Sequence, residues 1–324
     1  MTDDNILTVE GLQTWFETPK GTVKSVDGVN LTLRRGEILG LVGESGSGKS
    51  VTGFSIIGLI DKPGKVVGGR IDYRGEDLRT ASEARLRSLR GDKIVMIFQD
   101  PMMTLNPVLR IGTQMIETVL AHQKVSRAEA RARSLAALAK VGIPHPEERI
   151  DAYPHEFSGG MRQRVAIAIA LLHEPDLIIA DEPTTALDVT IQSQILAEMQ
   201  KLTEEMGLAM IWISHDLGVV AALAHRIAVM YAGRIVERGT TDEVLDHPRH
   251  PYTRGLIDST PMANVRGQPL HQIPGQAPPP LGRPQGCPFR PRCAHATDAC
   301  LMEPPETVSG SHGWRCFHPL EAAR

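Results

Sequence analysis

One eight-residue segment, GESGSGKS at residues 43–50, constrains the fold of this chain more than any other feature. It fits the pattern G-x-x-x-x-G-K-[ST] of a phosphate-binding loop. Residues 37–42 before it, which are apolar after Glu37, predict a short strand. The residues after it up to Leu59 predict a helix, and this is the context that such a loop requires. A Gly/Ser-rich turn with a lysine is the alternative, and both the spacing and the context disfavour it.

Each residue type in this loop has a physical role. Its glycines let the backbone approach a polyphosphate without Cβ clashes, while inward N–H groups and the positive end of the next helix attract negative charge. Lys49 would reach the β- and γ-phosphates, and Ser50 would place its hydroxyl on Mg²⁺. The residues that we expect to bind the phosphates and the ion are Gly43, Ser45, Gly46, Gly48, Lys49 and Ser50.

Composition narrows the class of protein. The 324 residues are enough for two domains, and a net charge of −3 gives no reason to expect nucleic acid as the main partner. The polar N-terminus, Met1–Asn5, does not resemble a signal peptide. Apolar runs such as residues 165–172 are too short to cross a bilayer. We therefore expect a cytoplasmic chain whose only route to a membrane is docking onto other subunits.

The predicted elements indicate an α/β chain. Strand patterns at residues 6–10 and 23–33 predict an antiparallel β subdomain before the loop. Residues 111–172 are almost entirely helical in pattern, which predicts a helical subdomain at about 104–172. From residue 176 to 236 strands alternate with helices, which predicts a mostly parallel sheet covered on both faces.

The character of the chain changes after residue 247. Seven prolines fall between Pro274 and Pro291, and proline excludes regular helix and central strand. We therefore predict an α/β fold in which a phosphate-loop nucleotide-binding domain occupies residues 1–247. A separate, loop-rich C-terminal extension that contains four cysteines follows at residues 248–324.

Two carboxylates follow the apolar residues 177–180, and in folds of this type such a strand end lies beside the phosphate loop. Asp181 would join the Mg²⁺ shell, and Glu182 would polarise the attacking water as a general base. A solvated strand end is the alternative, and the loop upstream makes it the weaker one.

A second helix start with exposed N–H groups is predicted at Ser158-Gly159-Gly160. Ser158 is a good N-cap, and the two glycines leave the first N–H groups of the helix accessible to an anion. An ordinary capped helix explains the same residues.

These motifs occur in one order with three further features. The order is the phosphate loop, Gln99, Ser158-Gly159-Gly160, Asp181-Glu182, Ala186-Leu187-Asp188 and His215 after an apolar strand. Over roughly residues 5–245 the chain thereby resembles the ATP-binding subunits of ABC transporters. In this family the motif around Ser-Gly-Gly begins with Leu and ends in Gln, whereas this chain has Phe157 and Met161 at those positions. These departures leave the Ser-Gly-Gly core intact.

The resemblance implies roles for residues that the chain alone does not explain. Gln99 would sense the γ-phosphate, share in the Mg²⁺ shell and link to the membrane subunits. Ser158 and Gly160 would contact the γ-phosphate of an ATP held by a partner ATPase, and Asp188 would belong to a loop that crosses the dimer interface. A lone histidine after a strand is usually structural. By the resemblance, however, His215 would contact the γ-phosphate.

The resemblance leaves two aromatic side chains as candidates to stack on the adenine of ATP. Phe16 would stack on the adenine, and the adjacent Trp15 competes with it for that role.

Further segments are similar to dipeptide and oligopeptide importers: QDPMMTLNP at 99–107, HPYTRGL at 250–256, IPG at 273–275 and GCPFRPRC at 286–293. The resemblance implies an ATPase that powers peptide uptake, bound peripherally to the cytoplasmic side of the inner membrane. Its partners would be a second ABC ATPase, in a heterodimer rather than a homodimer, two transmembrane permease subunits and an external substrate-binding protein. Nickel, glutathione or opine cargo, or a soluble ABC ATPase without a transport role, remain alternatives.

All four cysteines lie in the extension, at Cys287, Cys293, Cys300 and Cys316, with the spacing C-x5-C-x6-C-x15-C. Disulfides are rare in the cytosol, so clustered thiols there indicate a metal. Zinc ribbons favour C-x2-C pairs, whereas uneven spacing suits an iron–sulfur cluster at least as well. The resemblance implies a [4Fe–4S] cluster of structural role; zinc and free thiols are the alternatives.

Overall fold

The computed structural model describes residues 4–184, 187–260 and 271–321. It divides into two compact units. Unit 1 consists mainly of Thr80–Ile211, with Arg34–Glu37 and the N-terminus. Unit 2 consists of Leu7–Leu33, Ile38–Arg79 and the chain from Trp212 onward.

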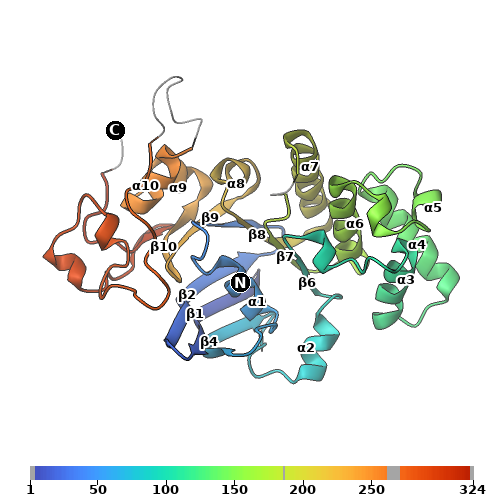
Figure 1. Cartoon of the computed structure of the whole chain (residues 1–324), viewed down its shortest axis with the longest axis horizontal. Coiled ribbons are helices and arrows are strands. Elements are labelled where there is room, and N and C mark those ends of the chain that lie inside the picture. Colours follow the sequence, from blue (N-terminus) through green and yellow to red (C-terminus); the bar gives the residue numbers. More distant parts are fainter. Residues whose placement is uncertain (1–3, 185–186, 261–270, 322–324) are drawn as a thin grey trace. The chain divides into compact units, whose positions relative to one another are not determined.

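Unit 1 is mainly helical. Its elements are α2 (Glu83–Leu89), β6 (Ile94–Ile97), η1 (Pro101–Met103), α3 (Ile111–His122), α4 (Arg127–Lys140), α5 (Pro146–Arg149), η2 (Pro154–Glu156), α6 (Gly159–Leu171), β7 (Leu177–Asp181), α7 (Val189–Met206) and the start of β8 (Ala209–Ser214). Helices α3, α4 and α6 pack on one another (Figure 1). Ile116, Val119 and Ala130 form a buried cluster between α3 and α4. This packing fixes the position of α6, which begins with the predicted Ser-Gly-Gly motif.

Strands β6 and β7 place the predicted acidic residues. They pair in parallel, from Ile94 opposite Leu177 to Ile97 opposite Ala180. The carboxyl ends of parallel neighbours meet at the same edge of a sheet. The residues that follow β6 therefore lie beside those that end β7.

Unit 2 contains two sets of strands. Its elements are β1 (Asn5–Thr18), β2 (Gly21–Arg34), β3 (Ile38–Val42), α1 (Lys49–Ile56), β4 (Gly64–Tyr73), β5 (Glu76–Asp77), α8 (Leu217–Leu223), β9 (Arg226–Tyr231), β10 (Arg234–Thr240), α9 (Thr241–Asp246), α10 (Pro251–Asp258), η4 (Arg290–Arg292), η5 (Asp298–Leu301), β11 (Thr307–Ser309) and β12 (His312–Trp314). The antiparallel sheet has the order β2-β1-β4-β5 and appears in blue in Figure 1. It is the β subdomain that the sequence predicted, with longer strands.

The second set has the order β11-β12-β10-β9-β3 and is mixed. β3 and β9 are parallel, but β10 and β12 are antiparallel to their neighbours. Only two residues, Ala232 and Gly233, join β9 to β10, both with positive φ, and a connection this short permits only an antiparallel pair. The predicted parallel pairing is therefore confirmed for β3 with β9, as it is for β6 with β7 in unit 1, whereas the antiparallel pairing of β10 with β9 and β12 was not predicted.

The extension contributes regular structure that the sequence reasoning did not predict. Helix α10 occupies Pro251–Asp258, and β12 pairs along β10 with Glu237 opposite Trp314. Residues 271–289 contain neither helix nor strand, as the prolines predicted.

Among the residues that the structure describes, no helix is both long enough and apolar enough to cross a membrane.

Candidate functional site

The phosphate loop of unit 2 lies between β3 and α1, as predicted, and two of its glycines are required by close backbone contacts. Gly43 has φ +150°, and a Cβ atom there would lie 2.1 Å from the carbonyl oxygen of Met230. Gly48 has φ +104°, and its Cβ would lie 2.2 Å from the carbonyl oxygen of Ser25. Any side chain at either position would push the loop away from β9 or β2.

Lys49 lies inside the curl of this loop. Its Nζ donates hydrogen bonds to the carbonyl oxygens of Gly43, at 2.7 Å, and Glu44, at 3.1 Å. The side chain is buried, and the open top of the loop is formed by the exposed Ser45 and Gly46. An ammonium held at this place, beside the start of α1, is suited to a polyphosphate.

The other predicted ATP contacts in unit 2 lie on β1 and after β8. Phe16 lies against Gly64, because a Cβ atom on Gly64 would come within 2.5 Å of the Phe16 ring. The Lys24 ammonium lies 4.6 Å from the centroid of the Trp15 ring. His215 is exposed and comes directly before Asp216, the N-cap of α8. Which ring stacks on adenine stays a prediction.

In unit 1 the structure brings two predicted catalytic residues into contact. The side-chain amide of Gln99 donates a hydrogen bond of 3.1 Å to the carboxylate of Glu182. Asp181 is the last residue of β7 and is buried, and Glu182 follows it with φ +46°. This left-handed backbone is uncommon outside glycine and often marks a functional position. It redirects the chain after β7, and the Glu182 side chain reaches Gln99.

The Ser-Gly-Gly motif and Asp188 each begin a helix. The Ser158 hydroxyl accepts the Met161 N–H at the start of α6, at 3.3 Å. The Asp188 carboxylate accepts the Ile191 N–H at the start of α7, at 3.0 Å. The two helix starts are neighbours, because a Cβ atom on Gly160 would lie 2.9 Å from the Ile191 side chain.

The exposed N–H groups that were predicted for this motif have a structural basis. A Cβ atom on Gly159 would meet nothing within 4 Å, so the first turn of α6 is open. Ser158 and Asp188 are exposed. Ala186, which completes the predicted Ala-Leu-Asp motif, lies outside the described residues.

The phosphate loop also has two partners that the sequence reasoning missed. The Tyr252 hydroxyl of α10 accepts the N–H of Glu44 at 2.9 Å. Arg292 of η4 forms an ion pair with the Glu44 carboxylate at 2.8 Å. Tyr252 belongs to the predicted HPYTRGL segment and Arg292 to GCPFRPRC, but nothing in either pattern indicates a contact with residue 44.

The four cysteines line one small cavity, together with Phe289, Phe317 and His250. Its free space is about 10 Å³, room for roughly one water molecule. Burial raises the pKa of Cys287, of Cys293 and of Cys316, the last to about 11. Hydrogen bonds from backbone N–H groups to the sulfurs lower these pKa values in part. One example is the His318 N–H, which donates to the Cys316 Sγ at 3.4 Å.

This donor set fits a metal only in part. The four cysteines line the same cavity, and N–H···S bonds are a feature of ligating thiolates. Within residues 4–184, 187–260 and 271–321, however, no group of three or more His, Cys, Asp or Glu side chains is arranged so that it could hold a metal ion. A cluster of several atoms would require the thiols to move apart.

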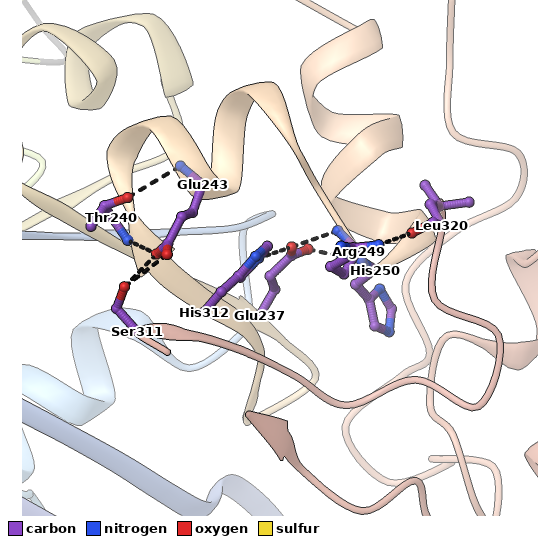
Figure 2. Close-up of polar contacts among 8 residues, drawn as sticks. All are labelled: Glu237, Thr240, Glu243, Arg249, His250, Ser311, His312 and Leu320. Carbon is purple, nitrogen blue, oxygen red and sulfur yellow. Dashed lines mark hydrogen bonds and ion pairs between the residues drawn. The ribbon is translucent and has the colours of Figure 1, made fainter. Parts of the chain in front are cut away.

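A buried carboxylate ties the extension to β10. Glu237 has no exposed surface and accepts the N–H groups of Arg249 at 2.6 Å and His250 at 2.9 Å. The His312 ring of β12 bonds the same carboxylate at 2.8 Å. Figure 2 shows these contacts converging on Glu237, with the Thr240–Glu243–Ser311 contacts nearby.

Comparisons with known proteins agree with this geometry. The family model of ABC transporters matches residues 26–185. The model of the oligopeptide/dipeptide transporter C-terminal region matches residues 236–300. The oligopeptide transport ATP-binding protein OppD of Salmonella typhimurium is 48% identical over 317 residues, 98% of this chain and 94% of the relative. The dipeptide transport ATP-binding protein DppD of Bacillus subtilis is 48% identical over 317 residues, 97% of this chain and 95% of the relative.

Solved structures agree as well. A dimeric post-hydrolysis state of the ATP-binding cassette MJ0796, bound to ADP and Pi, is 27% identical, has a TM-score of 0.66, and covers 72% of this chain and 98% of that one. The CbiO1 protein of Clostridium perfringens, part of the ABC transporter complex CbiONQ, is 30% identical with a TM-score of 0.65, over 76% of this chain and 92% of that one. The chain therefore belongs to the family of ATP-binding subunits of oligopeptide and dipeptide ABC transporters.

Proposed function

We propose that this chain hydrolyses ATP to power the import of dipeptides and oligopeptides across the cytoplasmic membrane. The observation that carries the ATPase part is the loop itself, in which Lys49 is buried beneath backbone that only glycine at positions 43 and 48 permits. The cargo part rests on the relatives, which are transport ATP-binding proteins for oligopeptides and dipeptides.

Each predicted site residue has a role in the reaction that we propose. Lys49 binds the β- and γ-phosphates, and Ser50 and Asp181 hold Mg²⁺. Glu182 polarises the attacking water as general base, and the 3.1 Å bond from Gln99 orients its carboxylate. Gln99 also contributes to the Mg²⁺ shell and the γ-phosphate contact, and His215 contacts the γ-phosphate.

The second half of each site comes from a partner subunit. One chain has one phosphate loop and one Ser-Gly-Gly helix, so a head-to-tail dimer would pair each loop with the other subunit's Ser158 and Gly160. Asp188 begins α7 next to that helix start and lies at the same interface. Hydrolysis then adds charge repulsion and loosens the dimer, which is the work stroke.

The assembly that we propose contains a second ABC ATPase, in a heterodimer, with two permease subunits and an external substrate-binding protein. The chain binds peripherally at the cytoplasmic face of the membrane. We also propose a domain boundary between residues 247 and 248 and a helical subdomain at about 104–172. We propose that the Phe16 ring stacks on the adenine.

Uptake of labelled di- and tripeptides into cells or proteoliposomes with the full complex tests the cargo. We expect Glu182→Gln to abolish peptide uptake while the complex still assembles in a mild-detergent pull-down. Nickel and glutathione serve as competing cargoes. If Glu182→Gln abolishes uptake of either one but leaves peptide uptake at the wild-type rate, the peptide assignment is wrong.

For the cysteines we propose a [4Fe–4S] cluster of structural role, with zinc as the alternative. The convergence of Cys287, Cys293, Cys300 and Cys316 on one cavity supports it, as do the N–H groups aimed at their sulfurs. Iron, sulfide and zinc analysis of anaerobically purified protein tests it. Stoichiometric zinc without iron would exclude the cluster.

A further inference from the structure

An arginine of the four-cysteine segment forms a two-pronged ion pair with the phosphate loop. Arg292 is the last residue of η4 and directly precedes Cys293. Its Nη1 donates to Glu44 Oε2 at 2.8 Å and its Nη2 to Glu44 Oε1 at 3.0 Å. Parallel bonds of this kind fix orientation as well as distance.

Arg292 is itself held rigidly. Only 5% of its side chain is exposed. Its Nε donates to the carbonyl oxygen of Pro274 at 2.8 Å, and its guanidinium lies 5.8 Å from the centroid of the Phe289 ring. A buried guanidinium needs its counter-charge, because an unpaired charge in this environment is strongly unfavourable.

Glu44 is the second residue of the loop, and its carboxylate, its N–H and its carbonyl group are each held by a hydrogen bond. Arg292 binds its carboxylate, and the Tyr252 hydroxyl accepts its N–H at 2.9 Å. Its carbonyl oxygen accepts the Lys49 ammonium at 3.1 Å. The segment that positions the lysine is therefore itself positioned by two residues of the C-terminal extension.

Arg292 and Tyr252 belong to one packed cluster of side chains. Tyr252 is fully buried, and its ring centroid lies 4.5 Å from that of Tyr231 and 5.4 Å from that of Phe289. The Tyr231 hydroxyl lies 3.4 Å from Arg292 Nη1. A displacement of either support is transmitted to the other, and through both to Glu44.

We propose that Arg292 and Tyr252 are positioning residues of the nucleotide site, which hold the phosphate loop in its binding conformation through Glu44. The extension then supplies two residues that position the ATP site. This inference rests on the proposed ATP-binding function. Without these supports the loop must be ordered by the nucleotide, and that cost lowers affinity.

ATP affinity of the full-length chain, measured by titration calorimetry, tests the proposal. We expect Arg292→Met to weaken ATP binding roughly tenfold, because it removes both hydrogen bonds to the Glu44 carboxylate and leaves the nucleotide to order the loop. Tyr252→Phe, which removes only the acceptor oxygen, should weaken binding about threefold. In the assembled transporter the KM for ATP should rise while kcat changes by less than about twofold, because the reacting groups are untouched.

Arg290→Met is the matched control, because Arg290 lies in the same short helix but forms no ion pair with Glu44 among the described residues. We expect its ATP affinity to equal that of the wild type. The double variant Glu44→Gln/Arg292→Met should bind no more weakly than Arg292→Met alone, since both changes break one interaction. Additive losses would show that Arg292 does not act through Glu44.

Lys49→Ala separates failure of this inference from failure of the proposed function. If wild-type binding survives Lys49→Ala, the ATP site itself is wrong. If binding depends on Lys49 but Arg292→Met, Arg292→Lys and Tyr252→Phe all bind like the wild type, the positioning role is overturned. Arg292→Lys keeps the charge without the fork, so it provides the test if Arg292→Met does not fold.

Discussion

Glu237 is a single residue on which the attachment of the extension depends. Its carboxylate bonds two backbone N–H groups and the His312 ring while fully buried. We expect Glu237→Ala to lower the free energy of unfolding by about 3 kcal/mol, because it leaves buried donors without an acceptor. Glu306→Ala, which removes the partly exposed ion pairs with Arg238 at 2.8 Å and Arg315 at 3.6 Å, is the control and should cost less than about 1 kcal/mol.

Urea unfolding of both variants measures the difference. Equal midpoints for Glu237→Ala and Glu306→Ala would mean that the buried carboxylate carries no special role in attaching the extension.

Local sequence order was enough to predict the loop residues and the strand end at Asp181. These positions follow from short patterns whose chemistry acts within a few residues. The Arg292–Glu44 pair joins positions 248 residues apart, and neither residue type is unusual in its own segment. Such a contact exists only once the strands and the extension have folded, so no local pattern could predict it.

Strand β3 and helix α8 pack closely because Gly40 of β3 has no side chain. A Cβ atom on Gly40 would lie 2.1 Å from a methyl carbon of Val220. We expect Gly40→Ala to destabilise the chain by about 1–3 kcal/mol, because it forces α8 away from β3. Since α8 begins just after His215, the same change should weaken ATP hydrolysis in the assembled complex.

A compensating variant tests this packing. Gly40→Ala/Val220→Ala should recover part of the thermal midpoint that Gly40→Ala loses, although Val220→Ala alone lowers it. If the two losses simply add, the contact is not the source of the strain.

Whole elements differed in how well the sequence predicted them. Long periodic segments such as α4 and α7 were found, whereas α10 and the β11–β12 hairpin were not. The strands of that hairpin have three residues each, too few for an alternating pattern to be seen. Helix α10 begins with His250-Pro251, a pair that reads equally well as a turn.

For the protein as a whole, the dimer that we propose requires a second ATPase subunit to complete each ATP site. We expect the purified chain alone to hydrolyse ATP slowly, and Glu182→Gln to reduce turnover in the assembled complex by at least about 100-fold. With ATP, Glu182→Gln should also hold the ATPase pair together in size-exclusion chromatography, whereas Lys49→Ala should not. Wild-type turnover by the Glu182→Gln complex would show that another residue is the base.

The pairing of β12 along β10 has a consequence for how the protein tolerates shortening. The Arg315 N–H donates to the Val236 carbonyl at 2.8 Å, continuing the pairing just beyond β12. A chain that ended before residue 300 would leave that side of β10 open, with donors and acceptors ready to pair with another molecule. Nonsense mutations that end the chain between β10 and residue 300 should therefore yield insoluble protein.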